Sequence, residues 1–267
     1  MNVPDLELVR DYSERAYRRF HHPRYISPDP LELVVPVEDP REREVVGFIA
    51  ASLAVGRVNA IIGAVSRILE QLSAAAGSVR AGVLELDFRE LSELFAGFSY
   101  RFFSTPAIAS FLAAIGDILR RYGSLEACFS AGLDGRDATV LPALAAFSLE
   151  LVKSAPVPCG ILVTDPVRGA SKRMHLFLRW MVRSDDVDPG GWTCVSPEKL
   201  MVPIDTHMLR MSRLLGLTSR RTADIGTVRE VTEIFRAIRP DDPVRYDFSL
   251  TRYGIHPEGR EELLRMQ

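Results

Sequence analysis

Hydrophobic residues recur every three or four positions along most of this chain, which is the spacing of helices with one buried face. One such stripe comprises Val58, Ile61, Ile62, Val65, Ile68 and Leu69. Another, in a helix expected to begin at Ser171, comprises Met174, Phe177, Leu178, Met181 and Val182. The strict alternation typical of half-buried strands is almost absent. The pattern therefore predicts a mostly α-helical fold.

The same pattern and its turn signals give approximate helix bounds. Further helices are predicted at residues 5–20, 88–95, 104–122, 124–131, 139–153, 205–215, 222–238 and 246–253. The apolar segment 42–72 is expected to break into two helices at Gly56-Arg57. Residues 31–37 could form a short strand, although Pro36 interrupts it. The proline-rich residues 21–43 and the turn-rich residues 185–203 are predicted to be irregular connectors.

Composition places the chain among ordinary globular proteins. It has 267 residues, of which 47% are hydrophobic and 25% are charged, and its net charge is −2. This length favours two packed subdomains. We expect residues 1–45 and 210–267 to form a discontinuous subdomain, and residues 46–209 to form the central one. A near-neutral total means that any surface for nucleic acid must be a local patch.

Cysteine usage and the N-terminal residues suggest a compartment. Cys128, Cys159 and Cys194 are scattered, which fits neither a disulfide framework nor a four-thiolate cluster. The first twenty residues are charged and amphipathic, unlike a signal peptide. We therefore expect a cytoplasmic protein without a membrane partner, and we expect it to be a monomer.

Basic residues cluster around the predicted central helix. Between Pro166 and Ser184 lie Arg168, Lys172, Arg173, Arg179 and Arg183, with no acidic residue. Such a band is either a solvated helix face or a surface that contacts phosphates. Only three of the 33 basic residues are lysines, namely Lys153, Lys172 and Lys199. A lysine, unlike an arginine, can become a nucleophilic amine.

The string Pro203-Ile204-Asp205-Thr206-His207-Met208 is the most specific in the chain. Asp205 is placed to cap the helix that follows, because its carboxylate can accept the free amide protons of the first turn. Most aspartates at such positions only cap. At the edge of a cleft, however, the same contact would hold an ionised carboxylate rigidly beside the positive end of a helix.

The residues PIDTHMLRMSRLLGL resemble the signature of the helix-hairpin-helix superfamily of base-excision DNA glycosylases. Bifunctional members carry a catalytic lysine upstream, and Lys172 lies 33 residues before Asp205. This gap is similar to that of the archaeal 8-oxoguanine DNA glycosylase group. The motifs KRMHLFLRWMVR and DPVRYDFSLTRYGI also resemble those of a bacterial family related to that superfamily. The resemblance implies two helical subdomains around a cleft.

The chain departs from the superfamily pattern in three places. Residues 166–170 read Pro-Val-Arg-Gly-Ala where the hairpin usually has glycine, a hydrophobic residue and glycine. The four-cysteine iron–sulfur loop of endonuclease III is absent, because no cysteine follows Cys194. The N-terminal base-recognition residues of the archaeal group have no clear match.

The resemblance implies a reaction and its residues. Lys172 would attack the sugar of a flipped, oxidised purine nucleotide such as 8-oxoguanine, form a Schiff base and allow strand cleavage. Asp205 would stabilise the developing positive charge. Since a lysine of ordinary pKa, about 10.4, is mostly protonated, its neighbours, such as Arg173, must lower that pKa. No cofactor is implied.

Other residues are candidates for contacts with DNA or with the base. Asp247 lies at the start of the last predicted helix and is either a base contact or a structural carboxylate. Phe177, Trp180 and Trp192 could stack on a flipped base, although most aromatics at helical spacing are core residues. Arg168 and Arg173 are candidates for phosphate contacts. Arg101 lies in a segment that resembles the Gly-Tyr-Arg element of oxoguanine glycosylases, where Phe102 and Phe103 are expected in the core.

Two alternatives to a glycosylase that binds damaged DNA stay open at this point. A nucleic-acid-binding protein without catalysis could use the same scaffold, which the altered hairpin and the near-neutral charge favour. A metal-dependent hydrolase could use Asp205 and His207, but no further ligands are evident in the sequence, and we expect no catalytic metal.

Overall fold

The structure, a computed structural model, describes residues 4–163 and 165–265. Residues 1–3, 266 and 267, which belong to the predicted discontinuous subdomain, lie outside the described ranges. None of the helices within those ranges combines the length and the apolar composition needed to cross a membrane.

The described residues form α-helices, short 3-10 turns and no β-strand, which confirms the predicted fold class. The helices are α1 (Leu6–Phe20), α2 (Pro40–Ser52), α3 (Val58–Ala76), α4 (Val79–Glu85), α5 (Phe88–Leu94), α6 (Thr105–Tyr122), α7 (Leu125–Ser130), α8 (Leu141–Ser154), α9 (Lys172–Val182), α10 (Thr206–Leu214), α11 (Ile225–Ile238), α12 (Asp247–Ile255) and α13 (Pro257–Arg265). The predicted break in segment 42–72 is the non-helical stretch 53–57 between α2 and α3.

Residue chemistry fixes many of these helix ends. Asp5 and Asp39 each accept two backbone amide protons in the first turns of α1 and α2. Gly77 and Gly123 follow α3 and α6 in the left-handed region, which glycine adopts without steric cost. The short strand considered for residues 31–37 does not form, because Pro30 begins a 3-10 turn, Pro30–Leu33, that Asp29 caps through the amide of Leu31.

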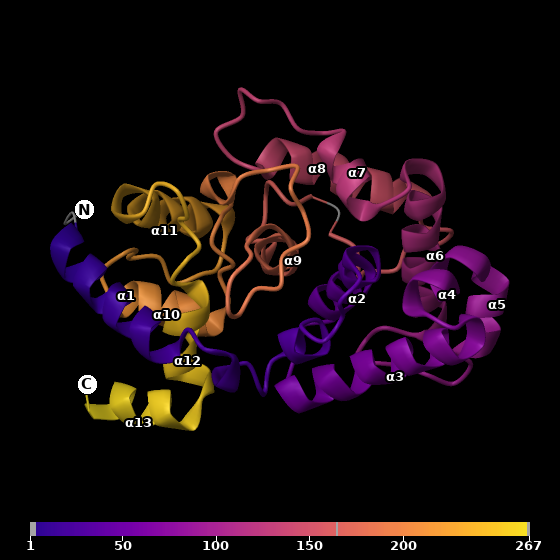
Figure 1. The fold of residues 1–267 in the computed structure, drawn as a ribbon, viewed down its shortest axis with the longest axis horizontal. Coiled ribbons are helices and arrows are strands. Elements are labelled where there is room, and N and C mark those ends of the chain that lie inside the picture. The colour runs from indigo at the N-terminus through magenta and orange to yellow at the C-terminus, as the bar shows by residue number, and fades with distance from the viewer. Residues whose placement is uncertain (1–3, 164, 266–267) are drawn as a thin grey trace.

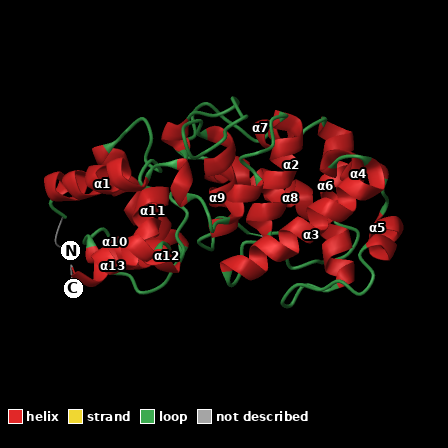
Figure 2. Cartoon of the chain, turned by 60° about the horizontal axis from the view of Figure 1, so that its bottom comes forward, coloured by secondary structure: helices red, strands yellow, loops and turns green. Residues whose placement is uncertain are grey.

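The helix α9 lies in the middle of the molecule, with helices from both ends of the sequence around it (Figure 1). Figures 1 and 2 both show α1 together with α10 to α13 at one end, and α3 to α6 at the other. Within the first group, α1 packs against α11 and α12, and α10 packs against α12. The division at residues 45/46 and 209/210 stays a prediction.

The predicted apolar face of α9 is buried. Met174, Phe177, Leu178, Met181 and Val182 all belong to the hydrophobic core, and α9 packs along α2. The first residue of α9, Lys172, is only partly buried. The core therefore anchors the body of the helix and leaves its N-terminal end at a surface opening.

Candidate active site

A pocket of about 470 Å³ opens at the N-terminal ends of α3, α9 and α10. Segments far apart in the sequence line it. They include residues 28–30 at the start of the 3-10 turn Pro30–Leu33, the N-terminal turn of α3, both Lys172 and Leu176 of α9, and α12. The walls contain aliphatic residues such as Val58, Ile61 and Leu176, and the polar groups belong mainly to α9, α10 and α12. This size and this mixture are typical of ligand pockets.

Lys172 and Asp205 face each other in this pocket. The Lys172 Nζ atom lies 3.6 Å from Asp205 Oδ2, and the side chains are 33% and 19% exposed. Lys172 begins α9, and the preceding Ser171 has a φ of 43°, an uncommon value for a residue other than glycine. The structure thus brings together the two residues to which the resemblance assigns the reaction.

The predicted cap by Asp205 is confirmed and fixes its carboxylate. Asp205 Oδ1 accepts a hydrogen bond from the backbone N–H of Met208 at 2.7 Å. With one oxygen tied to the first turn of α10, the other oxygen is the one nearest Lys172. The cap therefore leaves one oxygen for chemistry at the pocket.

Asp247 lines the same pocket but is almost fully buried, at 4% exposure. Its Oδ2 atom accepts a hydrogen bond from Arg179 Nη1, and Arg179 is buried as well. Burial raises the pKa of Asp247 to about 6, since the positive charge of Arg179 only partly offsets the desolvation and the nearby Asp205 adds repulsion.

His207 is the third titratable group near Lys172. It lines the pocket, and burial lowers its pKa, with Asp205 opposing that shift. The ring packs on Gly254 of α12 so closely that a Cβ atom there would lie 2.3 Å from His207 Nδ1. Among the described residues no three His, Cys, Asp or Glu side chains are grouped as metal ligands would be, so Asp205 and His207 have no third ligand of these types.

Residues 29–256 match the family described as "Protein of unknown function (DUF2400)". The chain belongs to this family. The matched range contains Lys172, Asp205 and Asp247. A search of curated proteins finds no match. A solved structure, "Crystal structure of Tm1821, the 8-oxoguanine DNA glycosylase of Thermotoga maritima", is similar with 16% identity and a TM-score of 0.49, over 92% of this chain and 96% of its own.

Three aromatic residues proposed to stack on a base lie instead in the core of this DUF2400 member. Phe177 and Trp180 are fully buried, Trp192 is 4% exposed, and none of them lines the pocket. Phe177 packs against Phe48 and Trp192, with ring centroids 5.0 and 5.1 Å apart. The prediction for Phe177 and Trp180 is therefore corrected, because a base cannot reach rings that the core covers.

The predicted basic band divides into exposed and buried members. Arg168 is exposed and pairs with Asp165 at 3.1 Å. Arg173 donates a hydrogen bond to the backbone oxygen of Ser52 at 2.7 Å and does not line the pocket. Arg179 and Arg183 are buried, so their inclusion in a surface band is corrected.

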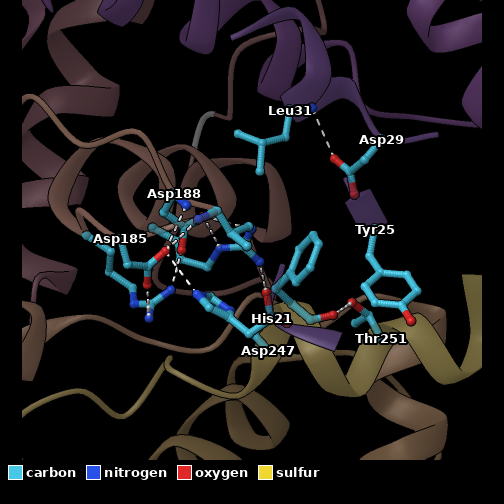
Figure 3. A network of polar contacts seen from close by, with 12 residues as sticks. His21, Tyr25, Asp29, Leu31, Asp185, Asp188, Asp247 and Thr251 are labelled. Carbon is cyan, nitrogen blue, oxygen red and sulfur yellow. Dashed lines mark hydrogen bonds and ion pairs between the residues drawn. The ribbon is translucent and has the colours of Figure 1, made fainter. Parts of the chain in front are cut away.

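Arg179 and Arg183 belong to a buried ionic network, which Figure 3 shows beside α12. Arg179 pairs with Asp188 at 3.0 Å and with Asp247, whereas Arg183 pairs with Asp188, Asp185 and Asp242. His21 reaches the network from the end of α1, with its Nε2 atom 3.0 Å from Asp185. The network joins α9, the connector after it and the segment before α12.

Arg101 and Phe102 form the exposed tip of a tight turn. The turn is closed by hydrogen bonds between Tyr100 and Phe103, and Arg101 has a φ of 55°. Phe103 is buried as expected, but Phe102 is 70% exposed, so its predicted place in the core is wrong. The Arg101 side chain lies against Gly56, which lines the pocket with a φ of 118°.

Sequence reasoning missed the second ion pair at the pocket. Arg252 Nη2 lies 2.9 Å from Asp29 Oδ2, and both residues line the pocket. They are separated by more than two hundred positions; Arg252 stands in the motif DPVRYDFSLTRYGI, but Asp29 stands in none. No local signal in the sequence could have joined them.

Proposed function

We propose that this protein is a DNA glycosylase with lyase activity at abasic sites, acting on an oxidised purine such as 8-oxoguanine. The observation that carries the proposal is the approach of the Lys172 amine to the Asp205 carboxylate, at 3.6 Å, in a pocket open to solvent. The resemblance of the segment around Asp205 to glycosylase signatures gives this pair its chemical interpretation.

The reaction begins with a nucleotide turned out of the duplex into the pocket. Asp205 Oδ2 is placed to accept a proton from the Lys172 ammonium group, which leaves a free amine. The amine attacks C1′ of the sugar, the C1′–N9 bond breaks, and the electron pair leaves with the base. Loss of the second amine proton and opening of the sugar ring give a Schiff base, from which β-elimination cleaves the strand.

Asp205 also acts on the charge of the transition state. As the C1′–N9 bond lengthens, the sugar becomes positively charged. A carboxylate held in place by a helix cap stabilises that charge without having to reorganise. The neutral substitution Asp205→Asn would keep the cap but remove this stabilisation.

The pocket wall provides the contacts for the base. Aliphatic side chains such as Ile61 and Leu176 offer flat apolar contact, and Asp247 offers a polar group. Within the described lining, His207 is the only aromatic ring. We therefore assign base contact to Asp247 and to aliphatic packing, in place of aromatic stacking.

Borohydride trapping tests the assignment of Lys172. Duplexes with a defined oxidised purine, or with an abasic site, are incubated with the protein and sodium borohydride. We expect a covalent adduct with wild type and with Lys153→Gln, which removes an exposed lysine on α8, and no adduct with Lys172→Gln. An adduct that survives Lys172→Gln would contradict the assignment.

Salt-dependent binding tests whether DNA contacts this face. Arg168 and Arg136 are both exposed and both pair with a nearby aspartate, but only Arg168 lies in the segment before Lys172. We expect Arg168→Ala to reduce the slope of log K against log salt by about 1, and Arg136→Ala to leave it unchanged. Equal slopes for both variants would exclude Arg168 from the DNA interface.

A binding protein without catalysis would behave differently. It would bind duplex DNA in a salt-sensitive way, release no base, and bind equally well after Asp205→Asn. Salt-sensitive binding without any adduct on abasic DNA would therefore contradict the proposed enzyme activity and support a binding protein without catalysis.

A further inference from the structure

The carboxyl group of Asp247 has an incomplete counter-charge. Its direct ionic partner is Arg179, whose guanidinium also pairs with Asp188 at 3.0 Å. Asp188 in turn has Arg183 as a second guanidinium partner. Arg179 is therefore shared by two buried carboxyls, and Asp188 has the better compensation of the two. Of these two carboxyl groups, Asp247 is therefore the one that more readily holds a proton.

The groups that face Asp247 support this location of the proton. Arg179 of α9 is the positive group in contact, whereas Asp188 of the connector and Asp205 at the start of α10 add negative charge. Lys172, the other cation near Asp205, is at 3.6 Å from that carboxylate. Burial acts in the same direction, since Asp247 is 4% exposed and its pKa is raised to about 6.

Base excision needs a proton at this place. When the C1′–N9 bond breaks, the bonding electron pair goes to the base, which leaves as an anion unless it receives a proton. Resting on the function proposed above, we propose that protonated Asp247 donates its proton to a ring nitrogen or exocyclic oxygen of the departing base. The base then leaves neutral, and Asp247 becomes a carboxylate paired with Arg179.

The other polar groups of the pocket are less suited to this step. Arg179 and Arg252 do not release protons in the usable pH range. Asp205 already faces Lys172 with one oxygen, and its other oxygen accepts the hydrogen bond that caps α10. Burial lowers the pKa of His207 and so disfavours its protonated form, whereas burial raises the pKa of Asp247 and favours the protonated form. The Thr251 hydroxyl donates to the backbone oxygen of Phe248.

Arg179 is a positioning residue in this scheme. Its contact holds one oxygen of Asp247, and its charge stabilises the carboxylate that remains after proton transfer. The remaining oxygen of Asp247 is the one available to the pocket. Proton donation thus becomes easier as the base leaves, because the charge appears beside a fixed guanidinium.

The test compares two reactions of the same protein. Excision of an oxidised purine requires a proton for the leaving base, whereas incision at a preformed abasic site has no base to protonate. We expect Asp247→Asn to slow excision by about 10²- to 10⁴-fold, the usual contribution of a general acid. Incision and borohydride trapping at the abasic site should stay within about threefold of wild type.

Asp242→Asn is the matched control. Asp242 pairs with Arg183 in the same network and its pKa is also raised by burial, but it does not line the pocket. We expect this variant to excise the base at the wild-type rate. An equal loss of excision in both variants would show that the network as a whole, and not Asp247, is required.

The pH dependence of wild type provides a second measurement, in case Asp247→Asn fails to fold. The ratio of excision to abasic-site incision should fall about tenfold per pH unit above the pKa of Asp247. A constant ratio would overturn the proposal, as would full excision by Asp247→Asn or an equal loss of both activities in a folded variant. Absence of any abasic-site adduct with wild type would instead overturn the proposed function itself.

Discussion

Burial decides the charge of several single residues in this protein. Asp247 holds its proton up to about pH 6, and Lys172 and Asp205 stay partly accessible at the pocket. His175 of α9 is 1% exposed, and neither ring nitrogen has a hydrogen-bond partner among the described residues. Burial alone lowers the pKa of His175 to about 4. The protein therefore carries a neutral histidine in its core.

His175 should make the fold sensitive to acid. Its ring takes up a proton near pH 6.5 when the chain is unfolded but only near pH 4 when it is folded, so stability falls as pH falls through this window. The full effect is about 3 kcal/mol for a shift of this size. Urea unfolding from pH 7.5 to pH 4.5 should show a shallower loss for His175→Leu than for wild type. Parallel curves of unfolding free energy against pH for the two proteins would contradict this role of His175.

Single residues also mark the limit of sequence reasoning. The motif around Asp205 and the position of Lys172 predicted a pair that the structure brings to 3.6 Å. Helical spacing placed Phe177 on the buried face of its helix but did not decide between core packing and base stacking, and nothing in the sequence indicated that Phe102 would be exposed. Helical spacing shows that a residue faces the core of a helix bundle, but not which face borders a pocket.

At the scale of elements, hydrophobic periodicity and turn signals predicted most of the helices. The prediction missed α4 and α13 and allowed a short strand at residues 31–37, where none forms. The helix α4 has only seven residues, too few to show a helical period. The sequence of α13, PEGREELLR, is mainly polar and gives little apolar periodicity. Where a segment is short or its hydrophobic periodicity is weak, tertiary contacts decide whether it forms a helix.

The contact between α10 and α12 depends on the absence of a side chain at Gly254. A Cβ atom there would lie 2.3 Å from His207 Nδ1, so Gly254→Ala must displace the ring beside Lys172 and Asp205. We expect a loss of about 1–3 kcal/mol in stability, typical of overpacking, and weaker borohydride trapping. Denaturant unfolding and adduct yield measure the two effects.

Gly63 offers the matched substitution. It lies inside α3, where an added Cβ atom would meet nothing within 4 Å. Gly63→Ala should raise stability by about 0.5–1 kcal/mol, because alanine favours the helix, and leave trapping unchanged. Equal stability and equal adduct yield for Gly254→Ala and Gly63→Ala would mean that the contact between Gly254 and His207 affects neither property.

At the scale of the whole molecule, the pocket is assembled from distant parts of the chain. Asp29 pairs with Arg252, and Arg183 joins α9 to Asp242 before α12. Hydrophobic periodicity and local motifs carry no information on such long-range ion pairs, which explains why the network was not predicted. In the structure this network holds the C-terminal helices and the end of α1 against α9 (Figure 3).

Breaking the network should destabilise the fold. Arg183 is 4% exposed and contacts Asp185, Asp188 and Asp242. Arg183→Leu removes one of the two guanidinium partners of the buried Asp188 and the ion-pair partner of the partly buried Asp242. We expect a loss of about 3–5 kcal/mol, measured by urea unfolding at pH 7. Arg136→Leu, which removes an exposed ion pair with Asp134, should unfold at the wild-type midpoint. A wild-type midpoint for Arg183→Leu would contradict this role.

The most direct test of the central claim is to locate the covalent bond. The chain has three lysines, Lys153, Lys172 and Lys199, so a borohydride-reduced adduct with abasic DNA can be digested and mapped by mass spectrometry without ambiguity. The account predicts that the added sugar mass lies on the peptide containing Lys172. An adduct on Lys153, on Lys199 or on the terminal amine would contradict it.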